Sequence, residues 1–407
     1  MKRSMFLVVL ILLTGFTFTQ EKTGLEDQVK EKIADIKPEL IKIRRHLHQY
    51  PELGNREFKT AELVANELKK LGYKVTEKVA HTGVVGILEG RKKGRIIAVR
   101  ADMDALPIQE ENDLPFKSKN DGIMHACGHD IHTIVGLGTA KVLASLKDQF
   151  DGTVKFIFQP AEEGSPAGER GGASLMVEEG VLENPAPEAI FGLHVNVAWE
   201  AGHFGYVPGG INASNDQFEI IIKGIGSHAA SPWNGIDPIV VSSHVILAIQ
   251  NIRSRMTDTR DPLVISIGII EGGTAFNIIP EQVRLVGTIR THDPEFRIEV
   301  RKKLKNVVKG ICSSFGATAE IVIDPGAPVN YNNPELTGWA VNIMNRVFGE
   351  DNVHLRRPSM GAEDFAHYSL KIPAFFYSLG VRNEAKGYTH PAHNPRFIAD
   401  ENSIEYG

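Results

Sequence analysis

The amino-acid sequence predicts an α/β protein with a mostly parallel sheet sandwiched by helices and an inserted smaller α+β domain. Strand-like apolar runs alternate with helical patterns in the first half of the chain, and this alternation resumes near the C-terminus. The section between them instead follows the pattern of half-exposed strands. Alternating strands and helices favour a parallel sheet covered on both faces. A chain of 407 residues is long enough for two to three domains.

The first section predicts the start of the larger domain. Apolar residues recur at helical spacing from Gly24 to Leu71. The predicted elements that follow are the strands Val84–Leu88 and Arg95–Arg100, the helix His132–Leu146, the strand Thr153–Gln159, the helix Ser174–Glu179 and the strand Ala189–His194.

The middle section, residues 213–325, predicts an inserted domain. Its expected elements are the strand Gln217–Lys223, the helix Pro238–Arg255, the strands Leu263–Ile270 and Gln282–Arg290, the helix Pro294–Phe315 and the strand Ala317–Ile323. This β-α-β-β-α-β order is typical of a small independent sandwich. Residues 20–212 and 326–407 would then form the larger domain. Its last elements are the helix Pro334–Phe348, the strand Ala374–Leu379 and the first turn of a helix at Ser403–Gly407.

The N-terminus is typical of a secretory signal peptide. Lys2 and Arg3 precede a stretch from Met5 to Phe18 that is largely apolar and shorter than the roughly 20 residues of a membrane span. We expect cleavage after Thr19, so that residues 1–19 are removed and the mature protein is periplasmic without a stable membrane anchor. An uncleaved anchor is the alternative interpretation.

Charge and cysteine content narrow the function classes. The formal net charge is −5, and the sequence has no basic run of the kind that follows a phosphate backbone, so we expect no nucleic-acid partner. The two cysteines are Cys127 and Cys312. Because Cys127 lies among histidines and Cys312 lies on an amphipathic helix pattern, we expect a metal-bound thiolate rather than a disulfide.

The densest polar cluster spans residues 124–132 and contains His125, Cys127, His129 and His132. It lies where a loop enters a helix. A single histidine here would be interpreted as a local cap, but this density favours a metal site. Thiolate and imidazole suit borderline divalent ions such as Zn²⁺, Mn²⁺, Co²⁺ or Ni²⁺.

Two further strands lead to candidate ligands. Glu162 and Glu163 follow the strand Thr153–Gln159, and His194 ends the strand Ala189–His194. Active sites in open α/β sheets lie at the carboxyl ends of strands. Adjacent carboxylates in an extended segment point in different directions, so that one can bind a metal while the other faces the substrate. Taken alone, the two glutamates would be solvated and His194 would be a core or rim histidine.

A C-terminal loop adds His390 and His393, which compete for one ligand position. Two metal ions about 3.5–4 Å apart need five or six protein ligands with one bridging group. Cys127 is a candidate for the bridge. A water shared by the two ions would be the nucleophile, and Glu162 would take its proton and pass it to the leaving nitrogen.

Several motifs follow one another along the chain: RADMDALPI (100–108), MHACGHD (124–130), QPAEEG (159–164), GSHAASP (226–232), GGTAFNIIPE (272–281), MGAEDF (360–365) and HNP (393–395). In this order they resemble the M20 metallopeptidases, and in particular their branch of N-acyl-amino-acid, hippurate and auxin-conjugate amidohydrolases. The resemblance runs from about residue 30 to the end of the chain.

The resemblance implies a ligand set, a base and a lid domain that is often used for dimerisation. The implied metal ligands are Cys127, His129, Glu163, His194 and His393, and the implied base is Glu162. His393 is preferred to His390 because it stands directly before Asn-Pro. We therefore expect two divalent ions, with Mn or Zn favoured over Co or Ni, and a homodimer formed through the lid.

The resemblance also implies residues that contact the substrate or support the ligands. His228, on the lid, would reach the substrate carbonyl, commonly in the partner subunit's site, and Asn277 would contact the substrate carboxylate or carbonyl. From the residues alone, both are turn-forming. Met360, Gly361 and Glu363 would line the pocket. Asp102 and Asp104 would support the metal ligands, with helix capping as the competing role.

These residues predict a metal-dependent amidohydrolase that cleaves the amide bond of a small N-acyl amino acid, of the hippurate type. A dipeptidase or exopeptidase would use the same site and differ in its pocket. A non-catalytic metal-binding clamp is the third possibility, but the intact Glu162–Glu163 pair argues against it, because such a protein does not need a base.

Overall fold

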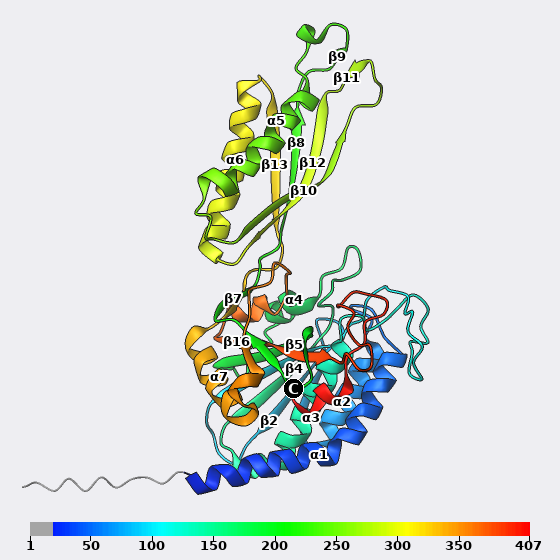
Figure 1. Cartoon of the computed structure of the whole chain (residues 1–407), viewed down its shortest axis with the longest axis vertical. Helices are drawn as coiled ribbons and strands as arrows, with labels where there is room; N and C mark the ends of the chain where they lie inside the picture. The colour runs from blue at the N-terminus through cyan, green and yellow to red at the C-terminus, as the bar shows by residue number, and fades with distance from the viewer. Residues whose placement is uncertain (1–18) are drawn as a thin grey trace, which may run out of the picture.

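The computed structural model describes residues 19–407, and side chains from residue 24 onward (Figure 1). The predicted signal peptide, residues 1–19, lies outside this range apart from Thr19, which begins the first helix. Within the described part of the chain, no helix is long and apolar enough to cross a membrane.

The larger of two bodies is built on an eight-stranded sheet with the order β1-β2-β4-β3-β5-β16-β6-β15. Its strands are β1 (Lys74–Val79), β2 (Gly83–Glu89), β3 (Ile96–Asp102), β4 (Thr153–Gln159), β5 (Ala189–Glu200), β6 (Phe204–Tyr206), β15 (Val353–Leu355) and β16 (Ala374–Arg382). The pairs β3–β4, β3–β5, β5–β16 and β6–β15 are parallel. The sheet is therefore mostly parallel, which confirms the predicted fold class.

Helices cover both faces of this sheet. One face packs against α1 (Thr19–Gln49), α2 (Phe58–Lys70), α3 (His129–Ser145) and α7 (Pro334–Phe348). The other face packs against α4 (Gly172–Glu178) and α8 (Ala366–Ser369). Side chains of β4 alternate between the two layers, with Phe156 and Phe158 in the first core and Ile157 in the second. This alternation follows from the two-residue period of a strand.

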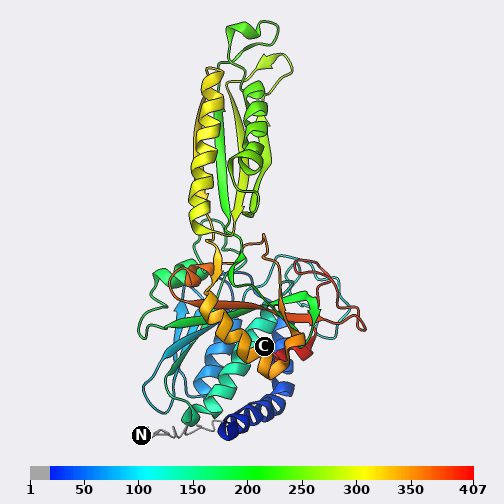
Figure 2. The same cartoon turned by 60° about the vertical axis from the view of Figure 1, so that its left-hand side comes forward.

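The smaller body contains the predicted β-α-β-β-α-β order. Its elements are β8 (Asp216–Lys223), α5 (Pro238–Asn251), β10 (Leu263–Gly272), β12 (Gln282–Thr291), α6 (Pro294–Ser314) and β13 (Thr318–Pro325). The strands form an antiparallel sheet with the order β10-β12-β8-β13. They share with α5 and α6 a separate apolar core that contains Cys312. The body extends away from the larger one (Figures 1 and 2), with a small ladder of β9 (Ser227–His228) and β11 (Ile278–Ile279) at its far end.

The helical pattern at 24–71 is confirmed: it forms the two helices α1 and α2, separated by a loop that contains Pro51. Some other local predictions were wrong. The C-terminal residues form a 3₁₀ helix, Glu401–Glu405, rather than the start of an α-helix. The sequence pattern also did not predict β1, whose two lysines and one glutamate are exposed, or β6, β15, β7 (Gly209–Asn212) and β14 (Asn330–Asn332). These strands are short or polar, so they lack a clear apolar period.

Candidate metal centre and active site

Adjacent parallel strands bring the predicted polar residues to one edge of the large sheet. β3 lies between β4 and β5 and is parallel to both. Asp102 ends β3, Glu162 and Glu163 follow the end of β4, and His194 lies on β5. Because the carboxyl ends of parallel strands share an edge, segments far apart in the sequence meet there.

The turn that begins α3 places Cys127 and His129 at the same edge. Gly128, between them, has a φ of 85°, a conformation that favours glycine. A Cβ at this position would also lie 2.5 Å from Cγ2 of Val195. Glycine therefore allows the loop to turn tightly against β5, with a candidate ligand on each side of the turn.

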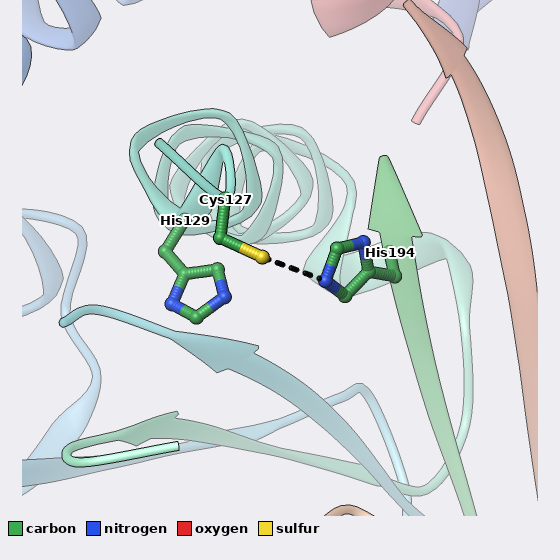
Figure 3. A group of neighbouring side chains, drawn as sticks. All are labelled: Cys127, His129 and His194. Atoms are coloured by element: carbon green, nitrogen blue, oxygen red, sulfur yellow. Dashed lines mark hydrogen bonds between the residues drawn. The ribbon is translucent and has the colours of Figure 1, made fainter. Parts of the chain in front are cut away.

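The five predicted ligands and the predicted base form overlapping clusters. Cys127, His129 and His194 each offer a ligand atom, and these atoms lie within 4.8 Å of one another (Figure 3). The same holds for Cys127 with Glu163 and His393, and for His129 with Glu162 and Glu163. Cys127 Sγ is 3.3 Å from His194 Nε2, and His393 Nε2 is 3.0 Å from Glu163 Oε1.

The side chains at this edge fit divalent metal ions. His129 is fully buried, and its Nδ1 contacts Asp104 Oδ1 at 3.0 Å. Its Nε2 faces the cluster and has no hydrogen-bond partner within the described residues. An imidazole held by a carboxylate on one nitrogen and left free on the other is the usual arrangement of a metal-binding histidine. Thiolate, imidazole and carboxylate together form a donor set suited to Zn²⁺ and similar ions.

Asp104 also positions a second candidate ligand. Its other oxygen, Oδ2, accepts a hydrogen bond from the backbone N–H of Glu163 at 2.9 Å. One buried carboxylate thus fixes both His129 and the segment that carries Glu163. This contact matches the supporting role that the resemblance implied for Asp104.

Asp102 and His132 are hydrogen-bonded to each other, and their polar atoms also lie within 4.8 Å of a ring nitrogen of His129. His132 Nδ1 contacts Asp102 Oδ1 at 2.5 Å, and His132 Nε2 accepts the backbone N–H of Val195 at 2.9 Å. Both ring nitrogens of His132 are therefore already engaged. His125 is also buried, but it belongs to none of the ligand clusters found in the described chain. The unbonded Nε2 of His129 therefore distinguishes it from His132 as a candidate ligand.

Burial and charge set the protonation of these groups. Burial raises the pKa of the Cys127 thiol, so its thiolate needs a nearby cation. Burial lowers the pKa of His129, but Asp102 and Asp104 outweigh it and leave that pKa raised. Burial also raises the pKa of Glu162, and the neighbouring Glu363 and Asp364 raise it further. Burial acts in the same direction on Glu163, but its contact with His393 and the proximity of His129 leave its pKa lowered.

Arg100 organises the acidic groups behind Glu162. Its guanidinium donates to Gln159 Oε1 at 2.8 Å, and to Asp102, Glu363 and Asp364 at 2.5–3.0 Å. Gln159 in turn donates to both carboxylate oxygens of Asp364 at 2.8 Å. No role was predicted for Gln159 or Asp364 from the sequence. Their only sequence signal was their position inside the motifs QPAEEG and MGAEDF.

A cavity of about 800 Å³ opens beside the cluster. Cys127, Glu162, Glu163, His194 and His393 all line it, as do Gly361 and Glu363. Met360 is not among its lining residues, and Glu363 is bound to Arg100 rather than free for a substrate. The cavity is also lined by two arginines that were not predicted from the sequence. They are Arg290 at the end of β12 and Arg356 just after β15.

The two residues predicted to act from the lid, His228 and Asn277, do not line this cavity. His228 and Ile278 are paired in the β9–β11 ladder, and Asn277 accepts the backbone N–H of Ala229 at 3.0 Å. His228 and Asn277 are both exposed; His228 lies on β9 and Asn277 directly precedes β11, the two strands at the far end of the lid (Figure 1). Within one chain, the structure therefore brings these two residues together but does not bring them to the metal cluster.

Comparison with known proteins decides the family. Residues 98–407 match the model of peptidase family M20/M25/M40. The chain belongs to this family. The match covers the metal cluster, the cavity and the whole smaller body, and it confirms the resemblance that the motifs predicted.

Similar M20 proteins align over nearly the whole chain. The chain is 41% identical to thermostable carboxypeptidase 1 of Saccharolobus solfataricus, over 94% of this chain and 96% of that protein. It is 40% identical to N-acetylcysteine deacetylase of Bacillus subtilis, over 90% and 93%. The solved structure of the Bacillus subtilis YXEP protein, a dinuclear metal-binding M20 peptidase, superposes with a TM-score of 0.79 at 37% identity, over 92% and 95%.

The family membership, the cluster and these relatives establish the coarse function. The protein is a metal-dependent hydrolase of the M20 family that acts on amide bonds. The ligand set, the general base and the identity of the metal stay predictions, because no comparison tests them residue by residue.

Proposed function

We propose that this M20 hydrolase cleaves the amide bond between an acyl group and an amino acid whose α-carboxylate is free. The observation that carries the proposal is the shared cavity, in which Arg290 and the metal cluster line the same space. Arg290 binds Thr288 Oγ1 at 3.2 Å and forms no ion pair within the described chain. A guanidinium is suited to bidentate contact with a carboxylate, so Arg290 can hold the amino-acid end of such a substrate.

The proposed metal ligands are Cys127, His129, Glu163, His194 and His393. They would hold two divalent ions, with Mn or Zn favoured over Co or Ni. Bound there, the ions would supply Lewis acidity to the substrate carbonyl and to the attacking water. The support in this chain is the mixed sulfur, nitrogen and oxygen donor set, together with the free, buried Nε2 of His129.

Glu162 is the proposed general base. It lines the cavity, and its carboxylate lies 3.9 Å from His129 Nε2, so it borders the cluster. Burial and the proximity of Glu363 and Asp364 raise its pKa, which brings proton uptake closer to neutral pH. Glu162 would accept a proton from the attacking water and deliver it to the leaving nitrogen of the amino acid. Arg100 keeps the neighbouring carboxylates in place during this transfer.

A homodimer formed through the lid would complete the site. The lid exposes apolar residues on the edge strand β10, including Ile269 and Ile270, and on α5, including Val240 and Leu247. Pairing of the lid with a second copy would cover such residues. In the arrangement implied by the resemblance, His228 and Asn277 would then reach the partner's cavity, where His228 can stabilise the oxyanion.

We also propose export to the periplasm, on the basis of the N-terminal sequence alone.

A substrate panel tests the proposal and separates it from exopeptidase activity. The metal-loaded protein would be assayed on N-acetyl and N-benzoyl amino acids, their carboxamide derivatives, and dipeptides with a free α-amino group. We expect turnover of acylated amino acids, with carboxamides losing at least about tenfold in kcat/KM, because a charged hydrogen bond contributes about 1.5–3 kcal/mol. Faster turnover of dipeptides would instead favour a peptidase, as the similarity to the carboxypeptidase suggests.

The variant Glu162→Gln tests the base. It preserves the shape of the side chain and removes its ability to take up a proton, so metal content should be unchanged while kcat falls by about 10²–10⁴-fold. Near-normal turnover by this variant would show that another group is the base.

A further inference from the structure

Arg356 places a second cation in the wall of the cavity, and it has no ion pair with any described side chain. Its side chain is partly buried, and it lines the same space as Arg290 and the metal cluster. Its NH1 donates to the backbone carbonyl of Arg357 at 3.0 Å, and its Nε has no partner within residues 24–407. Burial lowers its pKa, and no neighbouring carboxylate opposes that effect. A cation that is buried without a partner is stabilised by any anion that binds next to it in the cavity.

Neighbouring residues hold Arg356 in place. Its backbone N–H donates to the carbonyl of Tyr206 at 2.9 Å. Gly205, beside Tyr206 on β6, leaves room for two side chains: a Cβ there would overlap the ring of Trp199 and lie 3.2 Å from Cδ of Arg356. The Trp199 ring stacks on His354 with an interplanar angle of 7°. The stem of Arg356 and the ring of Trp199 therefore both pack over Gly205.

Arg100 provides the contrast within the same site. Its guanidinium is fully buried and bound to Asp102, Glu363 and Asp364, so its charge is already neutralised. Arg290 has one hydroxyl contact and lies in the field of Asp216, which raises its pKa against the effect of burial. Arg356 has only a backbone carbonyl. Of the three, it is the arginine whose charge is least compensated by the described chain.

We propose that Arg356 is a specificity-determining residue that binds a second carboxylate of the substrate, in addition to the α-carboxylate. This inference rests on the proposed function, because it extends the same cavity. The preferred substrates would be dianionic N-acyl amino acids. The second carboxylate has two possible sources: the side chain of an acidic amino acid, or a dicarboxylic acyl group such as succinyl. Either source offers the planar pair of oxygens that a guanidinium binds best.

Hydrolysis assays distinguish the two sources. One arm compares N-acetyl-glutamate and N-acetyl-aspartate with N-acetyl-glutamine and N-acetyl-asparagine. The other compares N-succinyl-alanine with N-butyryl-alanine. In the protein with Arg356 intact, the dianionic member of at least one arm should have a kcat/KM about 10–100-fold higher, and the arm that shows it identifies the source. Equal rates in both arms would overturn the proposal.

Variants assign any preference to Arg356. Arg356→Met should lower the ratio of kcat/KM for the dianionic substrate to kcat/KM for the monoanionic substrate by about 10–100-fold. Arg356→Lys should lower this ratio less, because lysine retains the charge but lacks the paired N–H donors of a guanidinium. Arg357→Met is the matched control, because Arg357 is exposed and does not line the cavity. It should leave the ratio unchanged. A preference that persists in Arg356→Met would assign the second carboxylate to another residue.

A binding measurement separates this inference from the proposed function. Calorimetry on the metal-loaded protein would compare N-succinyl-glycine with N-butyryl-glycine in the Glu162→Gln background, and then add Arg356→Met. We expect tighter binding of the dianion and loss of that difference in the double variant. If binding shows this pattern but no acylated amino acid is turned over by the protein with Glu162, the proposed function fails and the anion site stands. The same comparison of N-acetyl-glutamate with N-acetyl-glutamine covers the other source, and equal binding within both pairs would overturn the anion site alone.

Discussion

The predicted site has two halves: the sheet edge, which carries Cys127, His129 and Glu163, and the lid tip, which carries His228 and Asn277. They differ in how firmly the folded chain holds their side chains in position. At the sheet edge, Cys127 and His129 are buried, and Asp104 holds both His129 and the backbone of Glu163. At the lid tip, His228 and Asn277 are exposed and are held mainly by a two-residue ladder. The metal-binding half is therefore preorganised within one chain, whereas the lid half lies apart from the cavity.

This difference has a consequence for catalysis. Groups that bind metal ions must be fixed to within a fraction of an ångström, which burial and supporting hydrogen bonds achieve. Groups that contact only the bound substrate can be delivered later, by a domain movement or by a second subunit. We therefore expect variants at the edge to change metal binding and variants at the tip to change turnover alone.

The largest expected effect separates the two histidines of the C-terminal loop. His393 lies 3.0 Å from Glu163 and lines the cavity, whereas His390 does neither. His393→Ala should lose one metal ion per chain and more than about 100-fold in kcat, because a ligand is removed. His390→Ala, on the same loop, is the matched control and should keep both. Metal analysis by mass spectrometry with parallel kinetics decides, and the opposite result would make His390 the ligand.

The next prediction concerns His228 at the tip of the lid. His228→Ala should keep the metal content and lower kcat by about 10²–10³-fold, as expected for loss of an oxyanion donor. Mixing this variant with Glu162→Gln tests delivery by a second subunit. In a statistical mixture of two-fold dimers, half are heterodimers with one intact site, so about a quarter of full activity should return. If the mixture stays inactive although the subunits exchange, each lid serves its own chain.

The edge was predictable from the sequence because topology determines most of it. Strands that alternate with helices form a parallel sheet, and residues at the strand ends then meet. Cys127, Glu163 and His194 could therefore be grouped from the order of strands and helices alone. The choice of His129 over His132 could not be made in this way, since it depends on which ring nitrogens are already bonded to Asp102 and Val195.

The cavity wall was not predictable in the same way. Arg290 and Arg356 are far apart in the sequence, and neither stands out among the 45 lysines and arginines of the chain. Their significance comes from burial without a carboxylate partner, which only the folded chain reveals. Similarly, Glu363 lines the cavity as expected, but its ion pair with Arg100 was not predicted from the sequence.

A smaller effect on metal binding is expected for Asp104, which holds two predicted ligands in place but is not itself a predicted ligand. Asp104→Asn keeps the size of the side chain but replaces one acceptor oxygen with a donor, so it cannot hold both His129 and the backbone N–H of Glu163. Metal affinity should fall by about 10–100-fold, measured by competition with a chelating dye. Asp113→Asn, at an exposed position, is the control. Unchanged affinity in Asp104→Asn would mean that the edge is not held by this carboxylate.

The last prediction concerns the stability of the fold and not metal binding, because acids are buried beneath the edge. Glu57 is fully buried and accepts hydrogen bonds from Thr82 Oγ1 at 2.5 Å and from the backbone N–H of Ala161 at 2.8 Å. Burial, followed by the proximity of Asp104, raises its pKa to about 7. Between its ordinary pKa and this raised value, the folded state binds more protons than the unfolded state, so stability falls as pH rises through that window.

Glu57→Gln removes this proton linkage. At about 1.4 kcal/mol per pKa unit, the stability that the protein with Glu57 loses between about pH 4.5 and pH 8 should shrink in the variant by at most about 3 kcal/mol. Denaturant unfolding of the metal-free protein at several pH values measures this difference. Glu62→Gln, on the solvent side of α2, should leave the pH profile unchanged. If Glu57→Gln also leaves it unchanged, Glu57 ionises at its ordinary pH, and the acids beneath the edge are better solvated than their burial implies.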